Sequence, residues 1–128
     1  MPQSLPTREL PVVVVVDDDP AVCSSLKFAL ELEGFSVRTY GGGAALLSAA
    51  DLDTCACFVI DQKMPGLSGL DTIAALRGRR VSAPAILVIS DPSAGLSARA
   101  AAAKVVIVEK PFLGNALLDR IREACGLG

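Results

Sequence analysis

The hydrophobic and polar residues of this chain form two kinds of pattern, one typical of strands and one typical of helices. Four segments, residues 12–16, 57–61, 85–90 and 105–111, are unbroken apolar runs with polar residues only at their carboxyl ends. Such runs predict strands that are covered on both faces of a sheet. Residues 35–40 alternate polar and apolar positions, which predicts a fifth, less buried strand.

Apolar residues between these strands recur at helical spacing. The pattern predicts helices over residues 20–33, 44–52, 70–80, 96–104 and 115–126. Pro20 and Gly34 mark the two ends of the first helix, and Asp19 is expected to cap its first turn. The residues expected to face the core are Val22, Leu26, Ala29, Leu30, Leu70, Ile73, Leu76, Leu117, Ile121 and Ala124.

A strand followed by a helix, repeated five times, predicts an α/β fold. Parallel strands need helical crossovers, and the right-handed crossover places helices on both faces of the sheet. We therefore expect a doubly wound five-stranded parallel sheet with five helices. Residues 1–9 are polar with two prolines and read as a flexible N-terminal lead, while residues 10–128 form one domain.

Composition narrows the range of partners. The net charge of the 128 residues is −2, which favours neither nucleic acid nor an anionic membrane. No helix-turn-helix pattern is visible, no apolar run approaches the ~18 residues of a membrane span, and no targeting signal is readable, so we expect a cytoplasmic protein. The four cysteines, at positions 23, 55, 57 and 125, lack the spacing of a zinc site and are expected to be small apolar fillers.

Polar residues gather where the apolar strands end. Asp17 and Asp18 follow the first strand, Asp61 ends the third, Ser90 the fourth, and Lys110 lies at the end of the fifth. Ligands of doubly wound sheets bind at this carboxyl edge. Three carboxylates in one pocket raise one another's pKa, and a hard divalent cation such as Mg²⁺ relieves that repulsion. With Lys110 and Ser90, the set predicts phosphoryl transfer to an aspartate.

Four motifs in order carry a resemblance to a known family. "VVDDDPAV", "FVIDQKMPGLSGLD", "ILVIS" and "VEKPF" together resemble the receiver domain of two-component response regulators, over residues ~10–126. The resemblance implies a flavodoxin-like three-layer sandwich with strand order 2-1-3-4-5. It also implies a signalling protein that is phosphorylated by a histidine kinase or phosphotransfer protein, rather than an enzyme acting on a metabolite. Its own acyl phosphate would be hydrolysed slowly.

The resemblance assigns a metal role to four residues. Asp18 and Asp61 would ligate Mg²⁺, Asp17 would act more through bound water, and the backbone carbonyl of Lys63 would be the third protein ligand. The side chain of Lys63 would also influence the lifetime of the phosphoryl group.

The resemblance also assigns the phosphoryl contacts. Asp61 would be the phosphoacceptor, Ser90 would donate its hydroxyl to the phosphoryl group, and Lys110 would pair with the phosphoryl oxygens. Pro111 would follow a cis peptide bond. A homodimer through the last helices and strand is a further expectation from the family.

Some positions depart from the family pattern. Asp91 follows Ser90 where a small residue is usual, Pro92 comes next, and Ile107 replaces a typical aromatic residue. The fourth helix is almost all alanine. These departures leave a second interpretation open, a pseudo-receiver that serves as a constitutive binding or dimerisation module. A third, an aspartyl-phosphate phosphatase, lacks room for a cap domain. For Ser90, capping of the next helix is an alternative role. The basic residues Arg77, Arg79 and Arg80 are expected to be a solvated helix end, with contact to a partner as the alternative.

Overall fold

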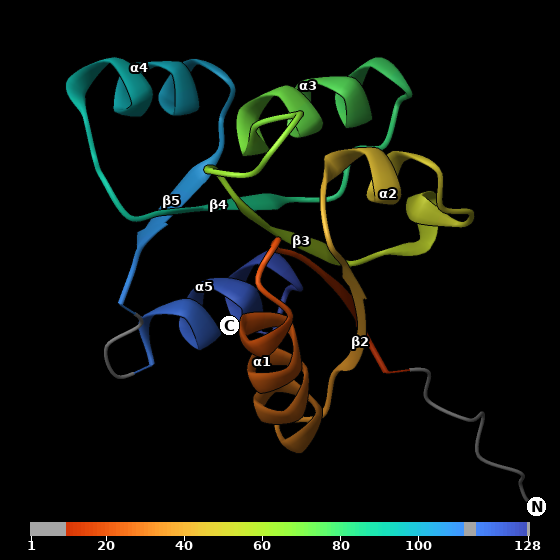
Figure 1. Ribbon diagram of the computed structural model, residues 1–128. Coiled ribbons are helices and arrows are strands. Elements are labelled where there is room, and N and C mark those ends of the chain that lie inside the picture. The colour runs from red at the N-terminus through yellow and green to blue at the C-terminus, as the bar shows by residue number, and fades with distance from the viewer. Residues whose placement is uncertain (1–9, 112–114, 128) are drawn as a thin grey trace, which may run out of the picture.

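A five-stranded parallel sheet forms the middle layer of the molecule. The computed structural model describes residues 10–111 and 115–127 (Figure 1). The strands are β1 (Val12–Val16), β2 (Ser36–Tyr40), β3 (Cys57–Asp61), β4 (Ala85–Ile89) and β5 (Val106–Glu109). Their order is β2-β1-β3-β4-β5, and every neighbouring pair is parallel. The doubly wound sheet and its strand order are confirmed. The predicted lead, residues 1–9, lies outside the described residues.

Helices cover both faces of this sheet (Figure 1). They are α1 (Pro20–Leu32), α2 (Gly43–Leu47), α3 (Gly69–Gly78), α4 (Ala94–Ala102) and α5 (Ala116–Ala124), with a 3₁₀ turn η1 (Leu52–Thr54) after α2. Helices α1 and α5 pack on one face, and α2, α3 and α4 on the other. This confirms the predicted three-layer sandwich.

The central strands divide the core into two halves. Successive side chains of a strand point to opposite faces. Val14 and Val16 of β1 therefore join the cluster under α3, while Val13 and Val15 join the cluster under α1 and α5. Because both faces are covered, β1 has no polar position between Val13 and Val16, and it ends on charge only where it leaves the core.

Helix α1 begins as predicted, and its inward face is confirmed at Leu30, which is buried, and at Leu26, which packs against the same cluster. The side chain of Asp19 accepts a hydrogen bond of 2.9 Å from the Ala21 N–H, and Gly34 takes a left-handed φ of +95° after the helix. The predicted inward position of Ala29 is wrong, since that residue is exposed. Cys23 is buried in addition, and its side chain packs in the same cluster as Leu30.

Strand β5 is less buried than the sequence predicts. The apolar run at residues 105–111 indicates a strand covered on both faces, but Val106 is 45% exposed and Ile107 is half-buried. The strand is the last of the sheet, and the helix layers that cover the centre leave this edge open. Continuous apolar sequence therefore did not distinguish an edge strand from a central one.

Several helix ends differ from their predicted positions. Helix α2 stops at Leu47, five residues early, with Ser48 as its C-cap, and Asp51 then adopts a left-handed φ of 59° before η1. Helix α3 ends at Gly78 rather than at Arg80, which has a φ of 63°. Helix α4 lies two residues earlier than predicted, since Ser93 caps it and Lys104 has a φ of 58°. These endings depend on backbone conformations that helical periodicity does not report.

The inward faces of the later helices are confirmed. Leu70, Ile73 and Leu76 of α3 are buried. Leu117 and Ile121 of α5 are buried too, and Ala124 is half-buried against the same cluster.

The cysteines pack much as predicted. All four are free thiols, and Cys23, Cys55 and Cys57 are buried in the core. Burial, with a smaller effect of the nearby Cys125, raises the pKa of Cys57 to about 12, so its thiol stays protonated at neutral pH. Within the described part of the chain, none of the helices is both long and apolar enough to span a bilayer.

Candidate functional site

Two buried carboxylates lie side by side where β1 and β3 end. Asp61 is the last residue of β3, and Asp17 comes directly after β1. The pairing of Val16 with Ile60 brings these two strand ends together. Asp17 is 5% exposed and Asp61 is 7% exposed. The parallel register therefore places both carboxylates at one point of the sheet edge.

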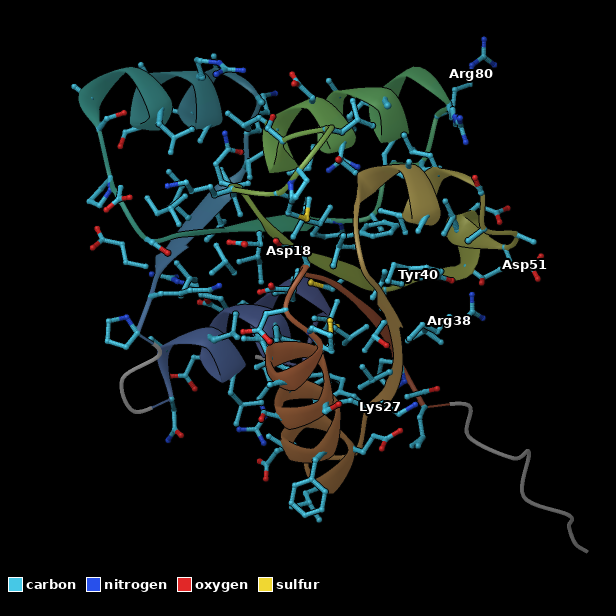
Figure 2. All side chains as sticks on the ribbon, in the orientation of Figure 1. Asp18, Lys27, Arg38, Tyr40, Asp51 and Arg80 are labelled. Carbon is cyan, nitrogen blue, oxygen red and sulfur yellow. The ribbon has the colours of Figure 1, made fainter. Side chains whose placement is uncertain are left out.

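Asp18 completes a cluster of three carboxylates. It is exposed and lies on the turn from β1 into α1, where Figure 2 labels it. One carboxylate oxygen from each of Asp17, Asp18 and Asp61 lies within 4.8 Å of the others. The sequence prediction that these three residues lie together is thus confirmed.

Lys110 supplies a positive charge to the two buried carboxylates. Its Nζ lies 3.1 Å from Asp17 Oδ2 and 3.6 Å from Asp61 Oδ1. The backbone N–H of Lys110 donates to the carbonyl of Ile89 at 2.8 Å, so the end of β4 holds the lysine beside the cluster. The peptide bond between Lys110 and Pro111 is cis, as the family resemblance implies.

The charges in this cluster do not balance. Burial, followed by the charge of Asp17, raises the pKa of Asp61, although Lys110 acts in the opposite direction. Burial alone would lower the pKa of Lys110. The hydrogen bond to Asp17 and the charge of Asp61 outweigh it, so the pKa of Lys110 is raised. One ammonium therefore faces three carboxylates, and the site carries a surplus of negative charge.

The donor set fits a hard divalent cation. All three side chains offer carboxylate oxygens, which are the ligands that Mg²⁺ prefers. Two are buried and held in place, since Asp17 Oδ1 also accepts the N–H of Asp19 at 2.9 Å and Asp61 ends a central strand. The exposed Asp18 leaves one side open, so a metal ion here would keep positions for water or a phosphate oxygen.

The loop after Asp61 is held by Gln62. Its N–H donates to the Val88 carbonyl, its carbonyl accepts from Gly69, and its side-chain Oε1 accepts from the N–H of Leu70 at 2.9 Å. These bonds join the start of α3 to the end of β3. No pattern in the sequence identifies Gln62 as a residue of the site. Its place beside Asp61 in the motif is the one signal for its role.

Gly69 permits the close approach of α3 to β3. A Cβ atom on Gly69 would lie 2.6 Å from the Asp61 carbonyl oxygen and 2.6 Å from Leu87 Cδ1. Real Cβ atoms essentially never come this close, so any side chain at position 69 would push the helix from the strand that carries Asp61. The glycine is thus part of the site's framework.

Ser90 and Lys63 lie beside the carboxylate cluster in an adjoining pocket. Ser90 follows β4 and is exposed, as is Lys63 in the loop after β3. Both line a pocket between the β3–α3 and β4–α4 loops, together with Gln62, Met64, Ser68, Ile89, Asp91 and Leu96. Ser93, whose side chain accepts the Leu96 N–H, caps α4, so the alternative that Ser90 caps this helix is wrong.

The basic cluster after α3 is partly structural. Arg77 Nη1 donates to the Val81 carbonyl at 2.7 Å, and Arg79 Nη1 donates to the carbonyl of Leu47. Arg77 and Arg79 therefore bind carbonyls close to the ends of α3 and α2, while Arg80 lies exposed after α3 (Figure 2). These contacts agree with the predicted position of the cluster at a helix end.

The chain is similar to known proteins along almost its whole length. The transcriptional regulatory protein FixJ of Azorhizobium caulinodans is 35% identical over 127 residues, which cover 98% of this chain and 57% of FixJ. The solved response regulator StyR superposes with a TM-score of 0.85 at 31% identity, covering 93% of this chain and 61% of its own. The chemotaxis protein CheY4 of Vibrio cholerae, at 21% identity and a TM-score of 0.83, covers 91% of this chain and 99% of its own and supports the fold.

These likenesses extend over nearly all of the described residues. This chain, in turn, spans less than two thirds of FixJ and of StyR. A sequence profile of the family described as "Response regulator receiver domain" matches residues 13–122, which include the whole carboxylate cluster and Lys110. The chain belongs to the response regulator receiver domain family.

Proposed function

We propose that this chain accepts a phosphoryl group on Asp61 from a histidine kinase or a phosphotransfer protein. The observation that carries the proposal is the cluster itself: Asp17, Asp18 and Asp61 converge within 4.8 Å, and Lys110 lies against two of them. A phosphoaspartyl group formed there would change contacts with other proteins. We further propose that residues 10–128 form one signalling domain of a cytoplasmic protein.

In the transfer step, a carboxylate oxygen of Asp61 attacks the phosphorus of a phosphohistidine. The P–O bond to Asp61 forms as the P–N bond breaks, and the electron pair of that bond returns to the imidazole. Lys110 lies 3.6 Å from Asp61 and would pair with a phosphoryl oxygen as negative charge moves onto the site. Asp17 holds the lysine in position through its 3.1 Å contact.

Mg²⁺, held by Asp18, Asp61 and the carbonyl of Lys63, with Asp17 acting through water, would supply charge neutralisation for the incoming phosphate. The residues of the neighbouring pocket act on the phosphoryl group after transfer. Ser90 would donate its hydroxyl to a phosphoryl oxygen by turning inward from its exposed position. Lys63, on the same pocket wall, would influence how fast water hydrolyses the acyl phosphate.

Contacts with DNA and with a second copy of the chain would follow the transfer. The relatives named as transcriptional regulators are longer than this chain, so we assign any contact with DNA to a part outside these residues. Family resemblance also suggests a homodimer through α4, β5 and α5, and this remains an expectation.

The proposal is tested by phosphorylation of purified protein with acetyl phosphate and Mg²⁺. Intact-mass measurement should show one added phosphoryl group on the wild type, and none on Asp61→Asn or in the presence of a chelator. Asp71→Asn is the matched control, because Asp71 is an exposed acid in the first turn of α3, outside the cluster. Modification that persists in Asp61→Asn would contradict the proposal.

The pseudo-receiver remains the second candidate because of one observation. Asp91 lines the pocket beside Ser90 and Lys63, where its carboxylate would repel a phosphodonor. If neither the wild type nor Asp91→Ala is modified by acetyl phosphate, and Mg²⁺ does not bind, this second function is favoured. If Asp91→Ala is modified faster than the wild type, Asp91 restricts access to a working phosphoacceptor.

A further inference from the structure

The outer face of α1 exposes large apolar side chains that the core does not use. Phe28 is 68% exposed and Leu32 is 70% exposed, and the two lie one helical turn apart. Leu32 also lines a groove between α1 and α5, whose floor consists of leucines that belong to or pack on the core: Leu26, Leu30, Leu117 and Leu118. We call Phe28, Leu32 and this groove the α1 face. A contiguous apolar patch of this kind is typical of an interaction surface.

Charged side chains border the α1 face in a definite order. Lys27 (labelled in Figure 2) and Glu31 lie on one flank of the helix, four residues apart, and their side chains are 48% and 47% exposed. Their own contact is long, at 4.0 Å, so it contributes little and leaves both groups available. On the groove side, Arg122 of α5 contacts Glu33 at 2.7 Å.

The order of these charges makes two copies of the helix complementary to each other when they pack antiparallel. When two copies of a helix pack antiparallel about a twofold axis, each flank meets the same flank of the other copy in reverse direction. Lys27 of one copy then meets Glu31 of the second, and Glu31 meets Lys27. In the same arrangement Phe28 approaches Leu32 of the second copy, so apolar side chains meet in the centre and opposite charges meet at the rim.

From this complementarity we infer that the α1 face binds a second copy of this chain in an antiparallel, twofold-symmetric dimer. The contact is separate from the β5 edge, where Val106 is the exposed apolar residue. It is also independent of the carboxylate cluster, because it involves the carboxyl-terminal half of α1, whereas the cluster lies before the amino end of that helix. The inference therefore does not rest on phosphorylation of Asp61.

The first test measures the mass of the unmodified protein by sedimentation equilibrium over a range of concentrations. The wild type should reach the dimer mass, and Phe28→Ser should weaken association about tenfold or more, as loss of a central apolar anchor does. Val106→Ser is the matched control and should leave association unchanged. A wild type that stays monomeric throughout, or loss of the dimer in Val106→Ser alone, would overturn the inference. Circular dichroism checks that each variant remains folded.

A second test uses the charges at the rim. Lys27→Glu and Glu31→Lys should each self-associate more weakly than the wild type, because like charges then meet across the twofold axis. An equimolar mixture of the two variants should recover a heterodimer, detected by native mass spectrometry, since opposite charges meet again. Recovery in the mixture supports the antiparallel pairing. If the mixture is no stronger than either variant alone, the pairing is wrong.

Discussion

A single glycine sets the distance between the helix α3 and the strand that ends in Asp61. Gly69 lies against the Asp61 carbonyl so closely that no side chain fits between them. The N–H of Gly69 also donates to the carbonyl of Gln62, the residue after Asp61, at 3.0 Å, which fixes the start of α3 against the end of β3. At the residue scale, the position of the proposed phosphoacceptor therefore depends on the absence of a side chain eight positions away in the sequence.

Gly69→Ala should destabilise the protein by about 2 kcal/mol or more, because the new methyl group would overlap backbone atoms that cannot move independently. The matched control is Gly95→Ala in α4, where a Cβ atom meets nothing within 4 Å. That variant should be neutral or stabilised by up to about 1 kcal/mol, since alanine favours the helix. Urea unfolding of both variants makes the comparison. Equal stability of the two variants would contradict the steric role of Gly69.

At the scale of the element, α1 links the acidic turn to the rest of the molecule. Asp19 caps the helix through the Ala21 N–H, and its own N–H donates to Asp17 Oδ1. The third aspartate of the run thus has a structural role, whereas the first two belong to the carboxylate cluster. This separation was predicted from the helix punctuation, and the structure confirms it.

Asp19→Ala should reduce the free energy of unfolding by about 1 kcal/mol, because one N–H of the first turn loses its partner. Asp19→Asn keeps an acceptor oxygen at the same place and should retain most of the stability. Thermal unfolding followed by circular dichroism distinguishes the two. If the asparagine variant loses as much as the alanine variant, the charge rather than the cap is what α1 requires.

At the scale of the whole molecule, the buried charge of Asp61 at the carboxyl edge of the sheet lowers the stability of the folded state. The folded chain raises the pKa of Asp61 above the unfolded value of 3.8, mainly by burial. The folded state therefore keeps the proton of Asp61 to a higher pH than the unfolded chain does. The contribution of Asp61 to the free energy of unfolding is therefore fully present below pH 3.8. It is lost as the pH rises through the pKa of the folded state.

Asp61→Asn should remove this part of the pH dependence and stabilise the metal-free protein at neutral pH. Bound Mg²⁺ should instead stabilise the wild type more than Asp61→Asn, because the variant lacks one of the three carboxylates. At about ten times its dissociation constant it should stabilise the wild type by about 1.4 kcal/mol, and Asp61→Asn by less. The measurement is the difference in unfolding free energy between wild type and variant, across pH and with Mg²⁺ or a chelator. A wild type that is insensitive to Mg²⁺ would count against a metal site.

The interior of the fold was largely predictable, since the apolar runs correspond to central strands and the helical spacing to α3 and α5. The errors concern helix ends and the exposure of some apolar residues. Ala29 is exposed because neighbouring elements set the rotation of α1, and Val106 is exposed because β5 is an edge strand. Neither property is encoded in local periodicity, because both depend on which other elements lie nearby.

The sequence by itself determined the strand pattern and the residues placed at each strand's carboxyl end, since burial of the strands forces their polar residues to that edge. It also identified Asp17, Asp18, Asp61 and Lys110 as a set. Only the tertiary structure decided how these residues meet, because the strand register and the Gln62 and Gly69 contacts join segments far apart in the chain. It likewise decided that Ser90 faces a neighbouring pocket and that α1 presents Phe28 and Leu32 to solvent, since exposure depends on the packing of the whole molecule.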